Sequence, residues 1–173
     1  MRLLTLWTSD HIPALPMPPG TSFERCDAPL KLARLARISS AEAEDRLEAG
    51  ERAYIASGPR GVVAIAWTAS TPGRASETSV ALQIGDGDLL ITLVRSYPPN
   101  ADIEAGLIAA IVRDEAESSE RFWYVDPAPE STDPSPAERA VFAAVPGVTL
   151  LNPGGAIVIP NPDDPRTTAA ARL

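Results

Sequence analysis

The chain has 173 residues with a formal net charge of −8, and its composition is 45% hydrophobic and 22% charged. This length and balance are typical of a single globular domain that buries its own core. The acidic charge argues against nucleic acid and anionic membranes as partners, because proteins bind both by placing Lys and Arg on phosphate.

Extended structure is predicted for the first 27 residues. Residues 1–20 read as a Pro-rich lead-in, with a short strand expected over 3–7. The prolines of this lead-in oppose helix and favour a polyproline-like backbone. They are Pro13, Pro16, Pro18 and Pro19. Residues 21–27 are interpreted as the first strand of the domain proper.

Two helices in series are predicted next. Residues 28–38 carry an apolar stripe at helical spacing and a basic face opposite it. The stripe is Leu30, Leu35 and Ile38, and the basic face is Lys31, Arg34 and Arg37. The second helix is expected to start at Ser39 as N-cap, with Glu42 as the capping-box partner, and to stop at Gly50.

The middle of the chain favours antiparallel strands. Residues 51–57 and 61–69 are predicted to form one hairpin, and residues 79–84 and 89–94 a second. Asp86 and Asp88 alternate with glycine in the turn "GDGD" of the second hairpin. Asp-Gly between two apolar runs indicates a hairpin turn, whereas a calcium loop needs more oxygen ligands at set spacings.

The last third predicts a crossover helix, a strand, a capped short helix and a terminal hairpin. The crossover helix has apolar residues at helical spacing, namely Ile103, Leu107, Ile108, Ile111 and Val112. The strand is 121–126, the short helix starts with Ser135, Pro136 and Glu138, the hairpin pairs 148–151 with 156–159, and 160–173 is a tail. Together the elements predict an α/β fold over 21–159: a mixed, mostly antiparallel sheet flanked by helices.

This order of elements resembles the GCN5-related N-acetyltransferase (GNAT) superfamily. The phrase "AEAEDRLEAGERAYIA" followed by "GVVAIAW" is similar to the second helix of that family running into its second and third strands. The likeness covers residues 21–159, and it implies the acyl-CoA-dependent N-acyltransferase fold.

The GNAT signature is a loop close to V-x-P-x-x-R-G-x-G-x-G/A-x-x-L, which holds the pyrophosphate of CoA on backbone N–H groups and a helix N-terminus. Only its hydrophobic frame survives here, as Val94 and Leu107. The altered positions are Ser96 for Pro, Pro99 for Arg, Asn100 and Asp102 for two glycines, and Glu104 for the third small residue.

Each change in this loop opposes a bound pyrophosphate. Pro99 removes a cation and a backbone donor. Asp102 and Glu104 bring carboxylates, and two like charges at about 6 Å repel by roughly 3 kcal/mol at an effective dielectric of about 20. Acids in the first helical turn can instead satisfy free N–H groups and complement the macrodipole, which is the role we expect for both.

The resemblance implies where a cofactor would bind if the protein is active. The motif positions for acetyl-CoA are Val94, Arg95, Ser96, Asn100, Ala101 and Asp102. The backbone of 94–96 would hold the pantetheine arm in the opening between the fourth and fifth strands of the family, and Arg95 would partly supply the missing cation.

No catalytic residue is assigned from the sequence. Many GNATs use a Tyr on the last helix to protonate the CoA thiolate, and Phe142 stands at or next to that place. Glu77 and Asp88 lie near strand ends where the family often has a general base, but surface solvation is the interpretation we favour. Tyr97 and Tyr124 match no family motif, and a strand tyrosine such as Tyr124 is expected to be packed.

Two hypotheses therefore follow. The protein has weak or no acetyltransferase activity and holds another small molecule or a protein in the opening, or it is a divergent acyltransferase acting on a small amine or a peptide N-terminus. A homodimer is compatible with both.

The chain has only one cysteine and one histidine, which limits the disulfide, metal and catalytic chemistry that it can carry. Cys26 is the only cysteine and His11 the only histidine, which argues against disulfides, metal sites and His-based triads. Cys26 is expected to be a buried small hydrophobe. The aromatic residues expected in the core are Trp67, Phe122 and Trp123. No apolar run approaches the roughly 20 residues of a membrane span, and no signal peptide is recognised, so a cytoplasmic protein is expected.

Overall fold

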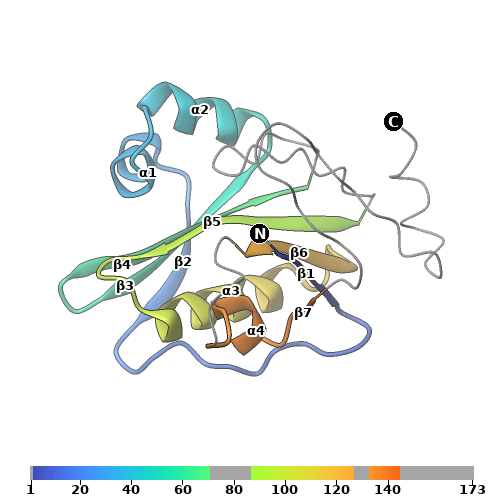
Figure 1. Ribbon diagram of the computed structural model, residues 1–173. Coiled ribbons are helices and arrows are strands. Elements are labelled where there is room, and N and C mark those ends of the chain that lie inside the picture. The colour runs from blue at the N-terminus through green and yellow to red at the C-terminus, as the bar shows by residue number, and fades with distance from the viewer. Residues whose placement is uncertain (1, 71–86, 127–132, 145–173) are drawn as a thin grey trace.

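The computed structural model describes residues 2–70, 87–126 and 133–144, shown in Figure 1. Seven strands form one sheet in the order β2-β3-β4-β5-β6-β1-β7. The strands are β1 (Arg2–Trp7), β2 (Ser22–Cys26), β3 (Arg52–Gly58), β4 (Gly61–Ala69), β5 (Asp88–Ser96), β6 (Arg121–Asp126) and β7 (Ala143–Ala144). The helices are α1 (Pro29–Ala36), α2 (Ser40–Glu48), α3 (Ala101–Glu115) and α4 (Pro136–Arg139). The predicted mixed sheet flanked by helices is confirmed.

Most predicted elements in the described part of the chain are found near their predicted bounds. Residues 79–84, 148–151, 156–159, 160–173 and Glu77 lie outside the described residues. The described neighbours of β5 are β4, antiparallel, and β6, parallel. The latter is the predicted crossover, with α3 between the two parallel strands. None of the four helices in the described ranges has both the length and the apolar character needed to cross a bilayer.

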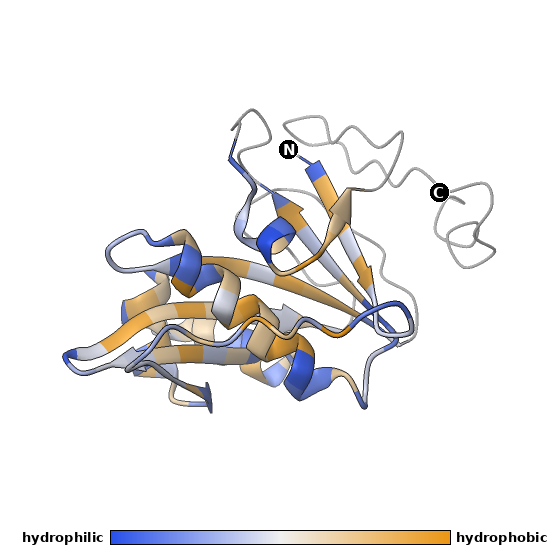
Figure 2. Ribbon diagram, turned by 90° about the horizontal axis from the view of Figure 1, so that it is seen from below, coloured by the Kyte–Doolittle hydropathy of each residue, from blue (hydrophilic) through white to orange (hydrophobic). Residues whose placement is uncertain are grey.

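The sheet separates two layers of helices, with α1 and α2 on one face and α3 and α4 on the other (Figure 1). The α3-side core includes Leu4, Tyr54, Ile91, Leu107, Ile108, Phe122 and Phe142. The α1-side core includes Cys26, Leu32, Ala36, Ile55, Ile65 and Trp67. Figure 2 shows hydrophobic residues running along the central strands, with polar residues gathered at turns and helix ends. The predicted burial of Cys26, Trp67, Phe122, Trp123 and Tyr124 is confirmed.

The predicted buried face of the first helix is wrong in part. Leu30 is 68% exposed, whereas Leu32, Ala33 and Ala36 are buried. Short alanine side chains let α1 approach the sheet closely, and they carry little weight in a pattern based on large apolar residues. The helix ends at Ala36, because Arg37 adopts the left-handed conformation (φ 60).

The lead-in contributes to the sheet and to its cover. β1 lies between β6 and β7, antiparallel to both. The following residues, 8–20, form a strap that passes under α3 (Figure 1). A Cβ on Gly106 would lie 3.2 Å from the carbonyl oxygen of Pro16, so a side chain here would require the strap to move by a few tenths of an ångström. Arg113 Nη1 donates to the carbonyls of Pro13 and Leu15 at 2.8 and 2.9 Å. The strap is thus fixed to the outer side of α3.

A strained residue ends α4 and gives a first testable prediction. Val141 has φ 62, and its N–H donates to Glu138 O while the N–H of Phe142 donates to Ala137 O, both at 3.0 Å. Glycine is the preferred residue at this left-handed position after a helix. Because Val141 is exposed and β-branched, Val141→Gly is expected to stabilise the protein by about 1 kcal/mol. Urea denaturation checks this, with Ala144→Gly, in the exposed edge strand, as a control that should not stabilise.

Candidate functional site at the carboxyl ends of β5 and β6

The two central parallel strands separate part-way along their length. Asp88–Ile91 pairs with Arg121–Tyr124, and β5 then continues to Ser96 paired only with β4 among the described strands. The separation coincides with a bulge: Thr92 faces Trp67 and Arg95 faces Ile65, so two residues of β5 oppose one of β4. One of the two is Leu93, with φ 51. β5 and β6 therefore diverge at the edge where ligands of parallel sheets usually bind.

The loop that leaves β5 leads directly into the N-terminus of α3. Asn100 is the N-cap, and its Oδ1 accepts from the N–H of Asp102 at 3.0 Å and of Ile103 at 3.2 Å. The expectation that Asp102 and Glu104 satisfy these helix N–H groups is therefore wrong. Asn100 directly precedes the first helical residue, so its short side chain can accept from the N–H groups two and three residues later, as an N-cap does.

Glu104 instead bonds back to the end of β5. It lies one turn before Leu107 and Ile108 and hence on the side of α3 that faces the sheet. Its Oε1 accepts from the backbone N–H of Ser96 at 2.9 Å and from the Ser96 hydroxyl at 2.7 Å. Ser96 is 1% exposed, and its Oγ accepts from the N–H of Asn100 at 2.6 Å. The carboxylate of Glu104 therefore links the start of α3 to the end of β5.

The backbone donors of this loop are almost entirely committed within the chain. The N–H groups with internal acceptors are those of Ser96, Tyr97, Asn100, Asp102, Ile103 and Glu104. Pro98 and Pro99 have no N–H. A bound anion would have to displace these acceptors.

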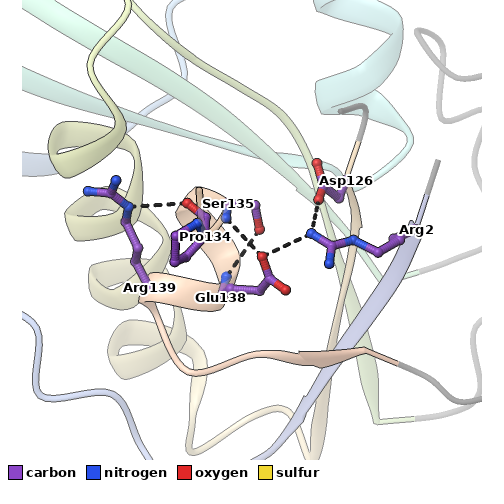
Figure 3. A network of polar contacts seen from close by, with 6 residues as sticks. All are labelled: Arg2, Asp126, Pro134, Ser135, Glu138 and Arg139. Atoms are coloured by element: carbon purple, nitrogen blue, oxygen red, sulfur yellow. Dashed lines mark hydrogen bonds and ion pairs between the residues drawn. The ribbon is translucent and has the colours of Figure 1, made fainter. Parts of the chain in front are cut away.

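A network of polar contacts lies at the carboxyl end of β6 (Figure 3). Arg2 Nη2 donates to Asp126 at 2.7 Å and to Glu138 at 2.9 Å, which joins β1, β6 and α4. Glu138 and Ser135 form the predicted capping box. The backbone N–H of Ser135 holds the pKa of Glu138 below its usual value, and Arg2 lowers it further against the effect of burial.

The remaining acid of the loop is also paired. Arg139 Nη1 donates to Asp102 Oδ1 at 2.7 Å, and Arg139 Nε donates to the carbonyl of Pro134 at 3.2 Å. The Asp102 side chain is 77% exposed, so this pair adds little stability. It does mean that the loop acids have partners inside the protein. Among the described residues, no three His, Cys, Asp or Glu side chains gather as a metal site.

Comparison with known proteins gives a likeness in structure only. No protein-family model and no curated protein matches the sequence. A GCN5-related N-acetyltransferase from Kribbella flavida matches with a TM-score of 0.56 at 14% identity, over 83% of this chain and 53% of the other. The fold is that of the GNATs. A protein assigned to the GNAT family from Novosphingobium aromaticivorans (TM-score 0.55, 15% identity, 83% of this chain, 59% of the other) agrees.

A functionally unknown conserved protein from Staphylococcus epidermidis has the same fold, with a TM-score of 0.54 at 8% identity over 83% of this chain and 57% of the other. This chain thus spans between 53% and 59% of the length of the three solved structures. At such low identity the likeness establishes the GNAT fold and leaves activity to be argued from the site.

The GNAT motif positions lie on both faces of the sheet. Val94 packs against the α3-side core, and Ser96 binds Glu104 on the same face. Strand alternation places Arg95 on the α1 face, away from the N-terminus of α3. Ala101 is the first residue of α3, and Asn100 caps it.

Phe142, Tyr97 and Tyr124 lie at three separate places in the fold. Phe142 is 4% exposed and belongs to the α3-side core. The hydroxyl of Tyr97 donates to the carbonyl of Leu35, which ties the loop to α1. Tyr124 is 6% exposed and pairs with Ile91, the last residue pair between β5 and β6.

The interpretation of Asp88 as a solvated surface residue is wrong. Asp88 is 5% exposed, and its carboxylate accepts two hydrogen bonds from Arg121, at 3.0 and 2.6 Å, and one from Trp123 Nε1 at 3.0 Å. The Arg121 guanidinium lies 4.4 Å from the ring centroids of both Trp7 and Trp123. The turn position indicated exposure, but the cross-strand partner Arg121, 33 residues away, buries the carboxylate.

Proposed function

We propose that the protein is a GNAT-fold binding protein with weak or no acetyl-CoA-dependent acetyltransferase activity. The single observation that carries this proposal is the internal bonding of the β5–α3 loop, above all Glu104 on the N–H of Ser96. In an anion-binding loop of this kind, free N–H groups must point at the ligand. In this protein the N–H groups of the β5–α3 loop already donate to acceptors within the same chain.

Charge and chemistry support the same proposal. A pyrophosphate beside the Glu104 carboxylate would be repelled by roughly 3 kcal/mol at about 6 Å and an effective dielectric of about 20. The resemblance to the GNATs puts Phe142 at or next to the place of the GNAT acid, and this buried side chain has no proton to donate. Loss of the cofactor contacts and of the acid together favours another role for the opening between β5 and β6. That role is the binding of a different small molecule or of a protein, in a monomer or a homodimer.

The second candidate is a divergent acyl-CoA-dependent N-acyltransferase acting on a small amine or a peptide N-terminus. The bulge at Leu93 and the separation of β5 from β6 favour it, because they keep an opening in the sheet. In that reading the backbone from Val94 to Ser96 holds the pantetheine arm, and Glu104 must first leave Ser96.

Thermal melting in acetyl-CoA separates the two candidates. At millimolar acetyl-CoA we expect no rise in the melting temperature of the wild-type protein. A ligand at 100 times its dissociation constant would stabilise by about 2.7 kcal/mol, or about 5–10 °C for a chain of this size. Such a rise would show that acetyl-CoA binds and would favour the acyltransferase. The matched variant restores the GNAT loop with Pro99→Arg, Asn100→Gly, Asp102→Gly and Glu104→Gly, and no recovery in it would mean that the opening has changed more widely.

A further inference from the structure

The outer side of α1 is basic and carries an exposed leucine. The residues that this helix buries against the sheet are Leu32, Ala33 and Ala36. The residues exposed on the opposite side are those of the predicted basic face, Lys31, Arg34 and Arg37. Leu30 lies beside them and is 68% exposed, more than any other large hydrophobic residue in the part of the chain that the structure describes.

The outer side of α2 is acidic. This helix buries Ala43 and Arg46, and helical spacing puts three acids on the side away from them. We call these exposed acids the acidic face, and they are Glu44, Asp45 and Glu48. Lys31 contacts Glu24 at 3.6 Å, whereas Arg34 and the acidic face make no ion pair within residues 2–70, 87–126 and 133–144. Charges of both signs are therefore available to a partner.

We infer that the outer sides of α1 and α2 form a homodimer interface, in which the basic face of each copy lies on the acidic face of the other. The two faces are adjacent, because α1 and α2 pack against each other on the same side of the sheet (Figure 1). A two-fold axis between the helices makes the same contact twice. Each contact pairs three cations with three carboxylates and covers Leu30. The inference goes beyond the proposed function and does not depend on whether acetyl-CoA binds.

A second copy of the chain is the partner that these charges fit. The net charge of the protein is −8, so the basic face is a local exception that needs an acidic partner surface. The acidic face supplies one on a neighbouring helix of similar length, nine residues against eight. Complementary charges at an interface set the orientation of the partners and speed their association. Two short helices give a small interface, so we expect a weak dimer with a dissociation constant of about 10 μM.

Charge reversal on each face tests the pairing by sedimentation equilibrium. One variant makes α1 acidic with Lys31→Glu and Arg34→Glu, and the other makes α2 basic with Glu44→Arg and Glu48→Arg. Each variant alone places like charges together, which should weaken the homodimer at least about 100-fold. An equimolar mixture should associate like wild type, because an acidic helix then meets a basic helix in both contacts. All four positions are exposed, so both variants should stay folded by circular dichroism.

Salt and a distant charge complete the test. Between about 0.1 and 1 M salt the Debye length falls from about 10 to 3 Å, so the wild-type dimer should weaken about tenfold. Arg60→Glu, in the exposed β3–β4 turn, should dimerise like wild type. The inference is refuted by a wild-type protein that stays monomeric at low salt, by variants that dimerise like wild type, or by a mixture that does not associate. Acetyl-CoA binding by the wild type would refute the proposed function instead.

Discussion

Asp88→Ala is expected to destabilise the protein by about 3–5 kcal/mol, the largest effect of any single change considered. Asp88 and Arg121 are 5% and 4% exposed, and they face each other across β5 and β6. Removing the carboxylate leaves a buried guanidinium and the Nε1 of Trp123 without this acceptor. Breaking one side of a buried pair costs this much because the remaining charge stays desolvated. Urea denaturation measures the loss.

The control for Asp88 is an exposed pair in the same protein. Asp102→Ala breaks the contact with Arg139, whose side chain is 37% exposed. Exposed pairs contribute about 0–1 kcal/mol, so this variant should melt close to wild type. If Asp88→Ala lost no more stability than Asp102→Ala, the buried pair would have no structural role.

The second large effect is expected at the C-terminal end of α3. Glu115 is 3% exposed and accepts from Arg52, from Tyr54 and, at 3.0 Å, from the hydroxyl of Ser118. Glu115→Ala should destabilise by about 2–3 kcal/mol, because the buried Tyr54 phenol loses its best acceptor and Arg52 its ion pair. Asp114 Oδ2 lies 3.3 Å from the Tyr54 hydroxyl and remains as a second acceptor, which reduces the loss of stability. Urea denaturation is again the measurement, and a loss below 1 kcal/mol would contradict it.

The same residue sets a pH dependence. Burial alone would raise the pKa of Glu115, but the hydrogen bonds from Arg52, Tyr54 and Ser118 outweigh it and lower the pKa below 4.5. A carboxyl with a lowered pKa in the folded state binds fewer protons than in the unfolded state. Its contribution is thus complete above the ordinary pKa and is lost as the pH falls through the lower value. Glu115→Ala should therefore lose less stability between neutral and acid pH than wild type.

Local signals in the sequence predicted most of the fold. The Ser39 and Ser135 caps and the strands 51–57 and 61–69 depend on residues within a few positions of each other. The spacing of Leu107, Ile108, Ile111 and Val112 predicted the buried face of α3, and all four are fully buried. Local pattern decides such features, because neighbours in sequence are neighbours in space.

The candidate site could be placed but not described from the sequence. The register on the GNAT loop indicated residues 94–104, and the loop lies where β5 and β6 separate. The bond from Glu104 to Ser96 depends on which way the first turn of α3 faces. The contacts of Arg2 with Glu138, 136 residues apart, and of Arg139 with Asp102, 37 residues apart, have no local signal. Contacts of this range are set by the packing of the whole fold and cannot be read from neighbouring residues.

Isothermal titration of acetyl-CoA into the wild-type protein tests the central claim, that the loop donors are already occupied by the chain itself. We predict no saturable binding up to millimolar acetyl-CoA, because the N–H of Ser96 and the N-terminus of α3 have internal acceptors. Saturable binding with a dissociation constant of about 10 μM, near −7 kcal/mol, would contradict it.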